Sequence, residues 1–235
     1  MIARRESELS RVRDHIEKQT GVVSSIIAAD ITREKDRQRI ESVLSRENIN
    51  ILINNAGITA HGRFDRTKPD VMRRTMEINF FALAELTHLL LPIMKRSSGI
   101  KTIVHVSSPS GLHGLPGRYA YSASKAASNV LMESLRVELH TEDFNVLNYM
   151  PGYTRTALRT SGLDEKGGRL HEEQAHHAKD PEDVANIMLD AIEKGKHTAF
   201  SDFTGRFVFW ARVMIPGMFS KILHRRFQKA PEAHS

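Results

Sequence analysis

The stretch T-I-V-H-V-S-S (residues 102–108) decides the fold. An apolar run of this length, rich in β-branched residues and bounded by small polar ones, is typical of a strand buried on both faces of a parallel sheet. Two similar runs occur: I-L-I (51–53), followed by N-N-A-G (54–57), and N-V-L-N-Y (145–149), followed by P-G-Y-T-R-T (151–156). Three predicted strands therefore each end in small or polar residues.

The segments around these strands have the spacing of amphipathic helices. Apolar residues recur at helical intervals over about 6–18, after Thr32, from Pro69 to about Lys95, over 120–135 and over 181–194. Further strands are predicted over 22–29 and 197–200, and the polar segment 161–179 is expected to be a mobile loop or a partial helix. This alternation favours an α/β fold, a Rossmann-like doubly wound parallel sheet with helices on both faces.

Composition places the chain among ordinary globular proteins. The 235 residues suffice for one large domain, with 40% hydrophobic and 26% charged residues. The net charge of +6 comes from 34 basic and 28 acidic residues that are interspersed, so no nucleic-acid partner is predicted. The chain has no cysteine, which excludes disulfides and cysteine nucleophiles. No apolar signal segment begins the chain, so a cytoplasmic location is expected.

The motif Y-S-A-S-K places Tyr121 and Lys125 one turn apart on one face of a predicted helix. A neighbouring ammonium group stabilises phenolate and lowers the pKa of a tyrosine, which suits general acid/base catalysis. The spacing alone is weak evidence, because such pairs also occur on helix surfaces. The serine pair 107–108 strengthens it, since it ends a strand at the edge where open α/β sheets bind ligands.

Four motifs together resemble those of the short-chain dehydrogenase/reductase family. In chain order they are N-N-A-G (54–57), Asn79 in M-E-I-N-F, the serine pair before Y-x-x-x-K, and P-G-x-x-x-T (151–156). The resemblance covers roughly residues 1–200. It implies an NAD(P)-dependent oxidoreductase that interconverts a ketone and a secondary alcohol.

The resemblance implies a catalytic role for four residues. Tyr121 would donate a proton to the substrate carbonyl, or remove one from an alcohol, and Lys125 would lower the pKa of Tyr121 and hold the nicotinamide ribose. Ser108 would hydrogen-bond the substrate oxygen and is preferred to Ser107 because it lies thirteen residues before Tyr121. Asn79 would support Lys125 through a water molecule, or instead bond a backbone group and fix a helix kink.

The same resemblance implies a cofactor site. Asn54, Ala56 and Gly57 would line the adenine ribose, while Pro151, Gly152 and Thr156 would border the nicotinamide. Asp30, at the end of A-A-D (28–30), would contact the adenine or merely cap the next helix, and both interpretations stay open. Tyr121 and Lys125 belong to the cofactor site as well.

The glycine-rich T-G-x-x-x-G-x-G motif of the family is absent from the chain. Neither T-G (20–21) nor G-L-H-G-L-P-G (111–117) has its spacing. A-R-R-E-S-E-L (3–9) resembles the end of the family's second strand, which implies a fold truncated at its N-terminus. An incomplete sequence is the expected explanation and a natural truncation the alternative. Arg4, with Arg5 second, would then pair with the 2′-phosphate of NADP, so NADP is expected rather than NAD.

Two further segments are less informative. H-E-E-Q-A-H-H (171–177) lacks the spacing of a zinc motif, so no metal is predicted, and its histidines are expected to be solvated or else to touch the substrate. The tail 201–235, set apart from the domain 1–200, is apolar, aromatic and basic, and is expected to be helical. It would form a substrate lid, a subunit interface, a peripheral membrane contact or plain core.

The sequence thus predicts an enzyme acting on a small, lipophilic carbonyl or alcohol, in a homo-oligomer that is cytoplasmic and in part membrane-associated. The alternative is an inactive, truncated family member that serves as a binding or partner subunit. The ordered set Asn79, Ser108, Tyr121 and Lys125 favours the enzyme, whereas the missing glycine loop favours the alternative.

Overall fold

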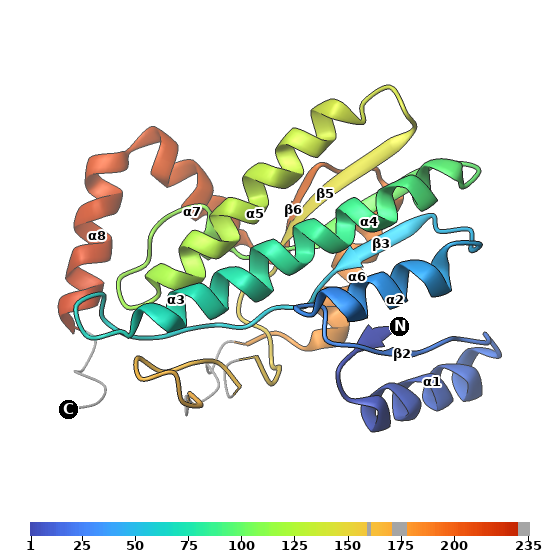
Figure 1. Cartoon of the computed structure of the whole chain (residues 1–235). Coiled ribbons are helices and arrows are strands. Elements are labelled where there is room, and N and C mark those ends of the chain that lie inside the picture. Colours follow the sequence, from blue (N-terminus) through green and yellow to red (C-terminus); the bar gives the residue numbers. More distant parts are fainter. Residues whose placement is uncertain (159–160, 171–177, 230–235) are drawn as a thin grey trace.

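Parallel strands and helices alternate along the chain in the computed structural model, which describes residues 1–158, 161–170 and 178–229 (Figure 1). The strands are β1 (Ile2–Ala3), β2 (Ile27–Ala28), β3 (Ile51–Asn54), β4 (Lys101–Val106), β5 (Phe144–Met150) and β6 (Thr198–Phe200). The helices are α1 (Glu6–Thr20), α2 (Glu34–Leu44), α3 (Pro69–Met76), α4 (Ala82–Arg96), α5 (Tyr119–Glu138), α6 (Pro181–Glu193), α7 (Phe203–Met214) and α8 (Pro216–Lys229). The α/β fold is confirmed.

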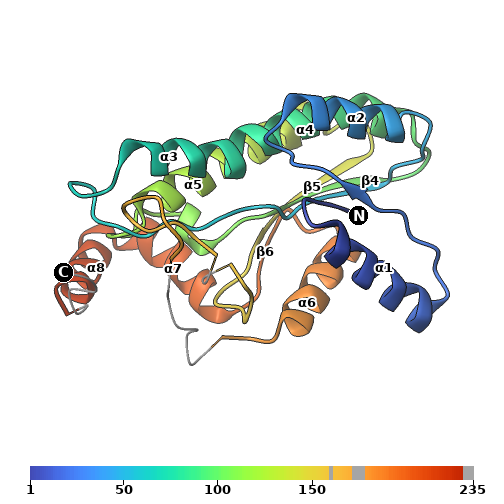
Figure 2. The same ribbon diagram turned by 60° about the horizontal axis from the view of Figure 1, so that its bottom comes forward.

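The helices cover both faces of the strands, as Figure 2 shows. Helices α4 and α5 lie on one face, where Met94 and Met132 pack against Ile103 of β4. Helix α6 lies on the other face, where Val184 and Ala191 pack against alternate strand residues. Because β4 is covered from both sides, its residues are buried from Lys101 to His105.

The strands form two separate sheets. Strands β3, β4, β5 and β6 pair in that order and all run parallel, whereas β1 pairs only with β2. Along the chain the division falls between β2 and β3. The resemblance implies a further strand between β1 and β3, because the family's first strand lies between its second and fourth. In the described residues the outer edge of β3 has no strand partner, and Ile51 and Ile53 are 51% and 41% exposed.

One apolar core cluster holds the two-stranded sheet to the rest of the molecule. Ile27 and Ala29, from β2 and just after it, pack with Ile40 of α2 and with Leu86 and Leu90 of α4. Strand β2 is shorter than the predicted 22–29, because β1 supplies a ladder of only two residues and Val23 stays exposed. The predicted helices around it are confirmed.

The longest helical run, Pro69–Arg96, is apolar and long enough to cross a membrane by length and composition alone. It consists of α3, the π-helical turn η1 (Glu77–Phe81) and α4. Side chains of α4 belong to two core clusters. Leu90 packs in the cluster with Ile27 of β2, and Met94 packs in the cluster with Ile103 of β4. This packing is that of a core helix in a globular protein.

The segment predicted as a loop or partial helix is irregular where it is described. Residues 161–170 form isolated bridges, in which Leu163 pairs with Ala60 and with Arg169. Residues 171–177, with the three histidines named above, lie outside the described part of the chain.

Candidate active site

The polar ends of β3, β4 and β5 lie side by side, as the parallel order requires. Asn54 is in register with His105, and His105 with Asn148. The loops that follow carry N-N-A-G, the serine pair and P-G-Y-T-R-T, so they leave the sheet at the same edge. The predicted convergence of three strand ends is therefore observed.

Tyr121 lies in the first turn of α5 and is turned inward, with 6% of its surface exposed. Ser108 follows β4 and precedes the short 3-10 turn η2 (Pro109–Gly111), where its oxygen accepts a hydrogen bond from the backbone N–H of Ser110. The side chains of Ser108 and Tyr121 are also hydrogen-bonded. The preceding Ser107 is buried and donates to Oδ1 of Asn129 at 2.5 Å. Of the serine pair, only Ser108 faces the tyrosine.

Lys125 is buried under the same loop, with 4% exposed. Its Nζ donates to the carbonyl oxygen of Val106 at 2.8 Å. Burial lowers the pKa of Lys125 from 10.5 to about 8, because the ammonium form loses water without gaining a carboxylate partner. One N–H of the ammonium group is thus used, and two remain for a ligand.

The pKa of Tyr121 differs from the expectation of a lowered value. Burial raises it, and the hydrogen bond with Ser108 and the charge of Arg118 oppose this effect only in part. The charge that acts against burial is thus that of Arg118. In the chain on its own the pKa of Tyr121 is therefore raised, and a lowering effect of Lys125 stays a prediction.

Asn79 is fully buried in the π-helical turn η1. Its Nδ2 donates to the carbonyl oxygen of Ile58 and to Oγ of Ser124, both at 2.9 Å, and its Oδ1 accepts from the backbone N–H of Ile58 at 2.8 Å. The amide therefore ties the loop after β3 to helix α5. This geometry matches the second of its two predicted roles, a backbone contact at a helix irregularity.

Gly57 lies against this polar group. A Cβ atom at this position would stand 3.1 Å from Oδ1 of Asn79 and 3.5 Å from Nζ of Lys125. The glycine therefore keeps open a space beside the ammonium group, into which a ligand could reach. Ala56 is exposed next to it, whereas the side chain of Asn54 is buried and donates to Thr87 at 3.0 Å. Asn54 can face a ligand only through its backbone.

The loop after β5 is fixed from the C-terminal side of the chain. Gly152 donates its N–H to Oγ of Ser201 at 2.8 Å, and a Cβ atom on Gly152 would collide with the carboxylate of Asp202. Pro151, Gly152 and Thr156 are half-buried. These three residues therefore border the same edge of the sheet as Ser108 and Tyr121.

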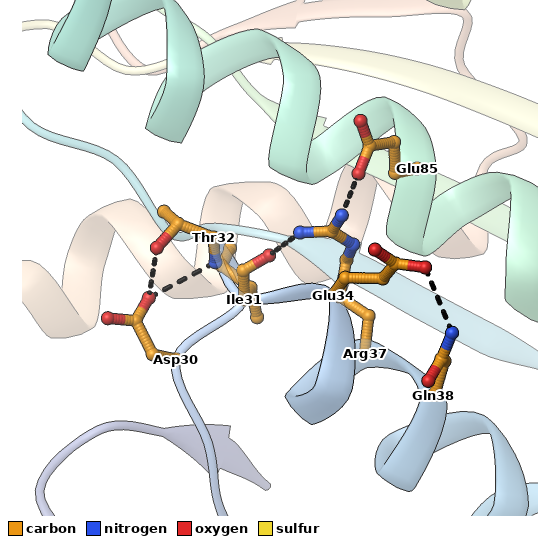
Figure 3. A network of polar contacts seen from close by, with 7 residues as sticks. All are labelled: Asp30, Ile31, Thr32, Glu34, Arg37, Gln38 and Glu85. Carbon is orange, nitrogen blue, oxygen red and sulfur yellow. Dashed lines mark hydrogen bonds and ion pairs between the residues drawn. The ribbon is translucent and has the colours of Figure 1, made fainter.

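Arg4 and Asp30 lie at the corresponding end of the two-stranded sheet, since the charge of Arg4 acts on Asp30. Burial raises the pKa of Asp30, but hydrogen bonds from Thr32 and the charges of Arg4 and Arg33 outweigh it and lower the pKa overall. Figure 3 shows Asp30 bonded to Oγ1 and the backbone N–H of Thr32, ahead of α2. These bonds close a turn before α2, whose N-cap is Arg33, so the predicted capping of the helix by Asp30 is wrong. The adenine contact stays a prediction.

The same view shows how the loop after β2 and helix α2 are joined to the core. Arg37 of α2 donates to the carbonyl oxygen of Ile31 at 2.7 Å and pairs with Glu85 of α4 (Figure 3). Arg37 is buried, with 7% of the residue exposed. The guanidinium group thus links the loop after β2 to the long core helix.

Sequence reasoning missed the partners that orient the site. Ser124, inside Y-S-A-S-K, bonds Asn79, and Thr87 of α4 bonds Asn54. A small polar residue on the sheet-facing side of α5 was the available signal for Ser124. Thr87 sits in an apolar helix with no signal of its own. Among the described residues no cluster of His, Asp and Glu is arranged to hold a metal ion.

The described residues suit the ribose groups of a nicotinamide dinucleotide but not its phosphates. The open space at Gly57 and the two remaining N–H groups of Lys125 suit ribose hydroxyls. In the described residues no glycine-rich turn opens a helix beside β1 or β3, so no phosphate cradle stands there.

The fold, the motifs and the matching family model establish the class of protein. The model of the short chain dehydrogenase family matches residues 1–167, and the chain belongs to that family.

The chain is 35% identical over 191 residues to dehydrogenase/reductase SDR family member 7B of Mus musculus, covering 80% of this chain and 58% of that protein. It is 33% identical over 240 residues to a dehydrogenase/reductase SDR family protein 7-like of Anopheles gambiae, covering 97% and 75%. The chain thus spans little more than half the length of the mouse relative.

Solved structures show the same fold. A short-chain dehydrogenase from Sphingobium yanoikuyae in complex with NADPH superimposes with a TM-score of 0.76 at 22% identity, covering 100% of this chain and 87% of that one. A short-chain dehydrogenase from Streptomyces avermitilis gives a TM-score of 0.76 at 25% identity, covering 97% and 86%.

Proposed function

We propose that the protein is an NAD(P)-dependent oxidoreductase that interconverts a ketone and a secondary alcohol. The observation that carries the proposal is the buried Tyr121, hydrogen-bonded to Ser108 and one helical turn from the partly unpaired ammonium group of Lys125. This grouping supplies a proton donor, a second hydrogen-bonding hydroxyl and a cation at one edge of the sheet. The catalytic residues are then Tyr121, Ser108, Lys125 and Asn79.

In the reducing direction the side chains would act on the substrate oxygen. The bound nicotinamide supplies or accepts the hydride. Tyr121 would donate its hydroxyl proton to the oxygen as negative charge develops there, and its raised pKa keeps that proton in place at neutral pH. Ser108 would donate a hydrogen bond to the same oxygen and hold it toward the tyrosine.

Lys125 and Asn79 would act through position and charge. The ammonium group of Lys125 would hold ribose hydroxyls and would stabilise phenolate once the proton has left Tyr121. Asn79, through Ile58 and Ser124, would keep the loop after β3 and helix α5 in register with one another. Its Oδ1 accepts one bond from the protein and can take a second from water.

The cofactor is proposed to be NADP, held at the sheet edge by Gly57, Ala56 and the loop 151–156. Arg4 beside Asp30 supports this choice, because a guanidinium group can pair with a 2′-phosphate and a carboxylate would repel it. Arg5, at the start of α1, is the second candidate. Asp30 would face the adenine.

Several broader expectations stay proposals. The substrate is proposed to be a small lipophilic carbonyl or alcohol, and the assembly a homo-oligomer in the cytoplasm with partial membrane association. The chain is proposed to divide into a domain over 1–200 and a helical tail over 201–235. The tail contributes α7 and α8, whose exposed phenylalanine, tryptophan and methionine side chains support a peripheral membrane contact.

The alternative, a family member without catalysis that serves as a binding subunit, rests on the lack of a phosphate cradle among the described residues. The two functions differ in one observable. A binding subunit would titrate with a ligand and consume no NADPH with any carbonyl compound.

The test uses the full-length product of the gene that encodes this chain. Consumption of NADPH is followed with a panel of aliphatic, aromatic and long-chain ketones, for the wild type and for Tyr121→Phe. We expect Tyr121→Phe to lower kcat/KM by about 10²–10⁴-fold, as the loss of a general acid does. Tyr119→Phe, in the same helical turn but packed on Phe64, is the matched control and should keep full activity. Equal rates for wild type and Tyr121→Phe would refute the proposal.

A further inference from the structure

The two C-terminal helices carry an exposed apolar stripe. On α7 it consists of Phe203, Phe207, Trp210, Val213 and Met214, which are between 57% and 78% exposed. Their spacing of three and four residues puts them on one side of the helix, opposite the buried Gly205. On α8, Met218 and Ile222 are also exposed. We name these seven side chains the C-terminal face.

The two helices that carry the C-terminal face contain basic residues and no acidic ones. Residues 203–229 contain six lysines and arginines and no aspartate or glutamate. Four of the six, Arg206, Arg212, Lys221 and Arg225, are exposed, and none of them forms an ion pair with a described carboxylate. A group of seven exposed apolar side chains accompanied by unpaired cations is typical of a binding site.

Resting on the peripheral membrane contact proposed above, we infer from this surface that the C-terminal face docks on a bilayer that contains anionic phospholipids. Aromatic and aliphatic side chains would enter the boundary between head groups and acyl chains, while arginine and lysine would contact the phosphates and carboxylates. Trp210 stands in the middle of α7, as an interfacial anchor would.

Charge decides against a second copy of the chain as the occupant. A two-fold interface through these helices would bring exposed cations of both copies together, and the helices themselves supply no carboxylate to neutralise them. An anionic lipid surface neutralises the same charges. The helices are also too short to span a bilayer, because 12 and 14 residues extend about 18 and 21 Å against a hydrocarbon core of about 30 Å. The protein would lie on the membrane.

The docking helices pack directly on the loop that follows Ser108. A Cβ atom on Gly205 of α7 would stand 3.1 Å from Pro109, and the ring of Phe219 of α8 lies 5.1 Å from the ring of His113. In Figure 1 both helices stand at the end of the molecule away from the N-terminus. A lipophilic substrate could then pass from the bilayer to Tyr121 along this loop.

The experiment uses the 235-residue chain without nucleotide, so its outcome is independent of the proposed catalysis. Trp210 is the only tryptophan in the chain, and its emission reports its own surroundings. Binding to vesicles of phosphatidylcholine, with and without phosphatidylserine, is measured by flotation and by tryptophan emission. We expect binding and a blue-shifted emission with the phosphatidylserine vesicles, both weakened by salt.

Three variants refine the test. Lys221→Gln with Arg225→Gln should weaken binding roughly thirtyfold, since each basic residue near an anionic surface contributes several-fold. Phe207→Asp should weaken binding at least as much. Val137→Glu, on α5 and exposed at 77% against 57% for Phe207, is the matched control and should bind as the wild type. Circular dichroism verifies that each variant is folded.

Three results would overturn the inference. The first is a Trp210 emission that no vesicle shifts, and the second is equal binding to vesicles with and without phosphatidylserine. The third is a dimer, measured by light scattering, that Phe207→Asp dissociates while the wild type floats with no vesicle. That result would make a second copy the occupant.

Discussion

The two sheets of this molecule differ in how firmly they are held. The four-stranded sheet β3–β6 is covered by helices on both faces, and the residues proposed for catalysis lie in the loops and helices that pack on it. The two-stranded sheet β1–β2 has a ladder of two residues per strand, and one apolar cluster and the Arg37–Glu85 pair hold it to α4. The proposed proton transfer thus lies on the well-supported sheet, whereas the proposed choice of cofactor lies on the weakly supported one.

The same contrast exists between neighbouring strands. Ile103 of β4 is completely buried, whereas Ile53 of β3 is 41% exposed, although their strands pair in register. Strand β3 is an edge strand here, with its polar C-terminal end buried and its apolar middle open to solvent. Asn54, at the end of β3 nearest the proposed catalytic residues, is thus buried although Ile51 and Ile53 of the same strand are exposed.

The largest effect is expected for a matched pair of truncations in the 235-residue chain. Ile103→Ala should lower the free energy of unfolding by about 2–5 kcal/mol, because it leaves a cavity in a packed core. Ile53→Ala should cost roughly 1 kcal/mol, because little of its surface leaves water on folding. Urea denaturation measures both. An equal cost at the two positions would show that β3 is covered in solution and would remove the contrast.

Lys125 predicts a pH dependence that its substitution abolishes. Its pKa is about 8 in the folded chain and near 10.5 when unfolded, so between these values the unfolded state binds more protons. Stability should therefore rise from pH 8 to 10.5, and burying the ammonium group below pH 8 should be costly. Lys125→Met should stabilise the nucleotide-free chain at pH 7 by about 2 kcal/mol, after loss of one hydrogen bond.

Urea midpoints at pH 7 and pH 10 measure this effect. The wild type should gain stability between the two values, and Lys125→Met should gain much less. Parallel changes in the two proteins would mean that another group causes the pH dependence.

A smaller effect is expected for cofactor choice. In the full-length gene product Arg4→Ala should weaken the binding of NADPH by about tenfold, since one charge-assisted contact to the 2′-phosphate is lost. The binding of NADH should not change. Titration followed by nucleotide fluorescence gives both dissociation constants. Arg5→Ala is the matched comparison, and a larger loss for it would transfer the role to Arg5. If neither variant discriminates between the nucleotides, the two-stranded sheet does not select NADP.

The smallest effect concerns the attachment of that sheet. Glu85→Gln removes the charge opposite Arg37 and should cost under about 1 kcal/mol of global stability, because the Glu85 side chain is 48% exposed. Amide hydrogen exchange in β2 and α2 should nevertheless speed up, while β4 and β5 stay unchanged. Glu138→Gln on α5 is the control. Uniform exchange across all four elements would show that the sheets open together.

The sequence was sufficient for most of the fold, and for placing the site, for a physical reason. Buried parallel strands such as 102–107 are continuous apolar runs, and the ends of such strands meet at one edge. Ser108 and Tyr121 could therefore be placed together before the structure was known. Strand β2 was predicted too long because V-V-S-S-I-I-A-A has the pattern of a strand, whereas its length depends on the two residues of β1.

The pKa of Tyr121 could not be predicted, because its direction depends on three-dimensional burial. The four-residue spacing to Lys125 indicates a favourable charge, but the structure buries the hydroxyl and gives Lys125 a carbonyl partner instead. The side-chain bond of Asn54 to Thr87 was equally hidden, since nothing in an apolar helix marks a threonine as a partner. Such pairings exist only once helices are packed on strands.

The central claim is that proton transfer rests on Tyr121 of helix α5, which packs on the four-stranded sheet, independently of how the nucleotide is selected. The most direct test is kcat/KM of Tyr121→Phe in the full-length gene product, with NADPH and with NADH, against a ketone that the wild type reduces. We predict losses of about 10²–10⁴-fold that are equal for the two nucleotides, with an unchanged unfolding midpoint. An unchanged rate, or a loss confined to one nucleotide, would contradict the claim.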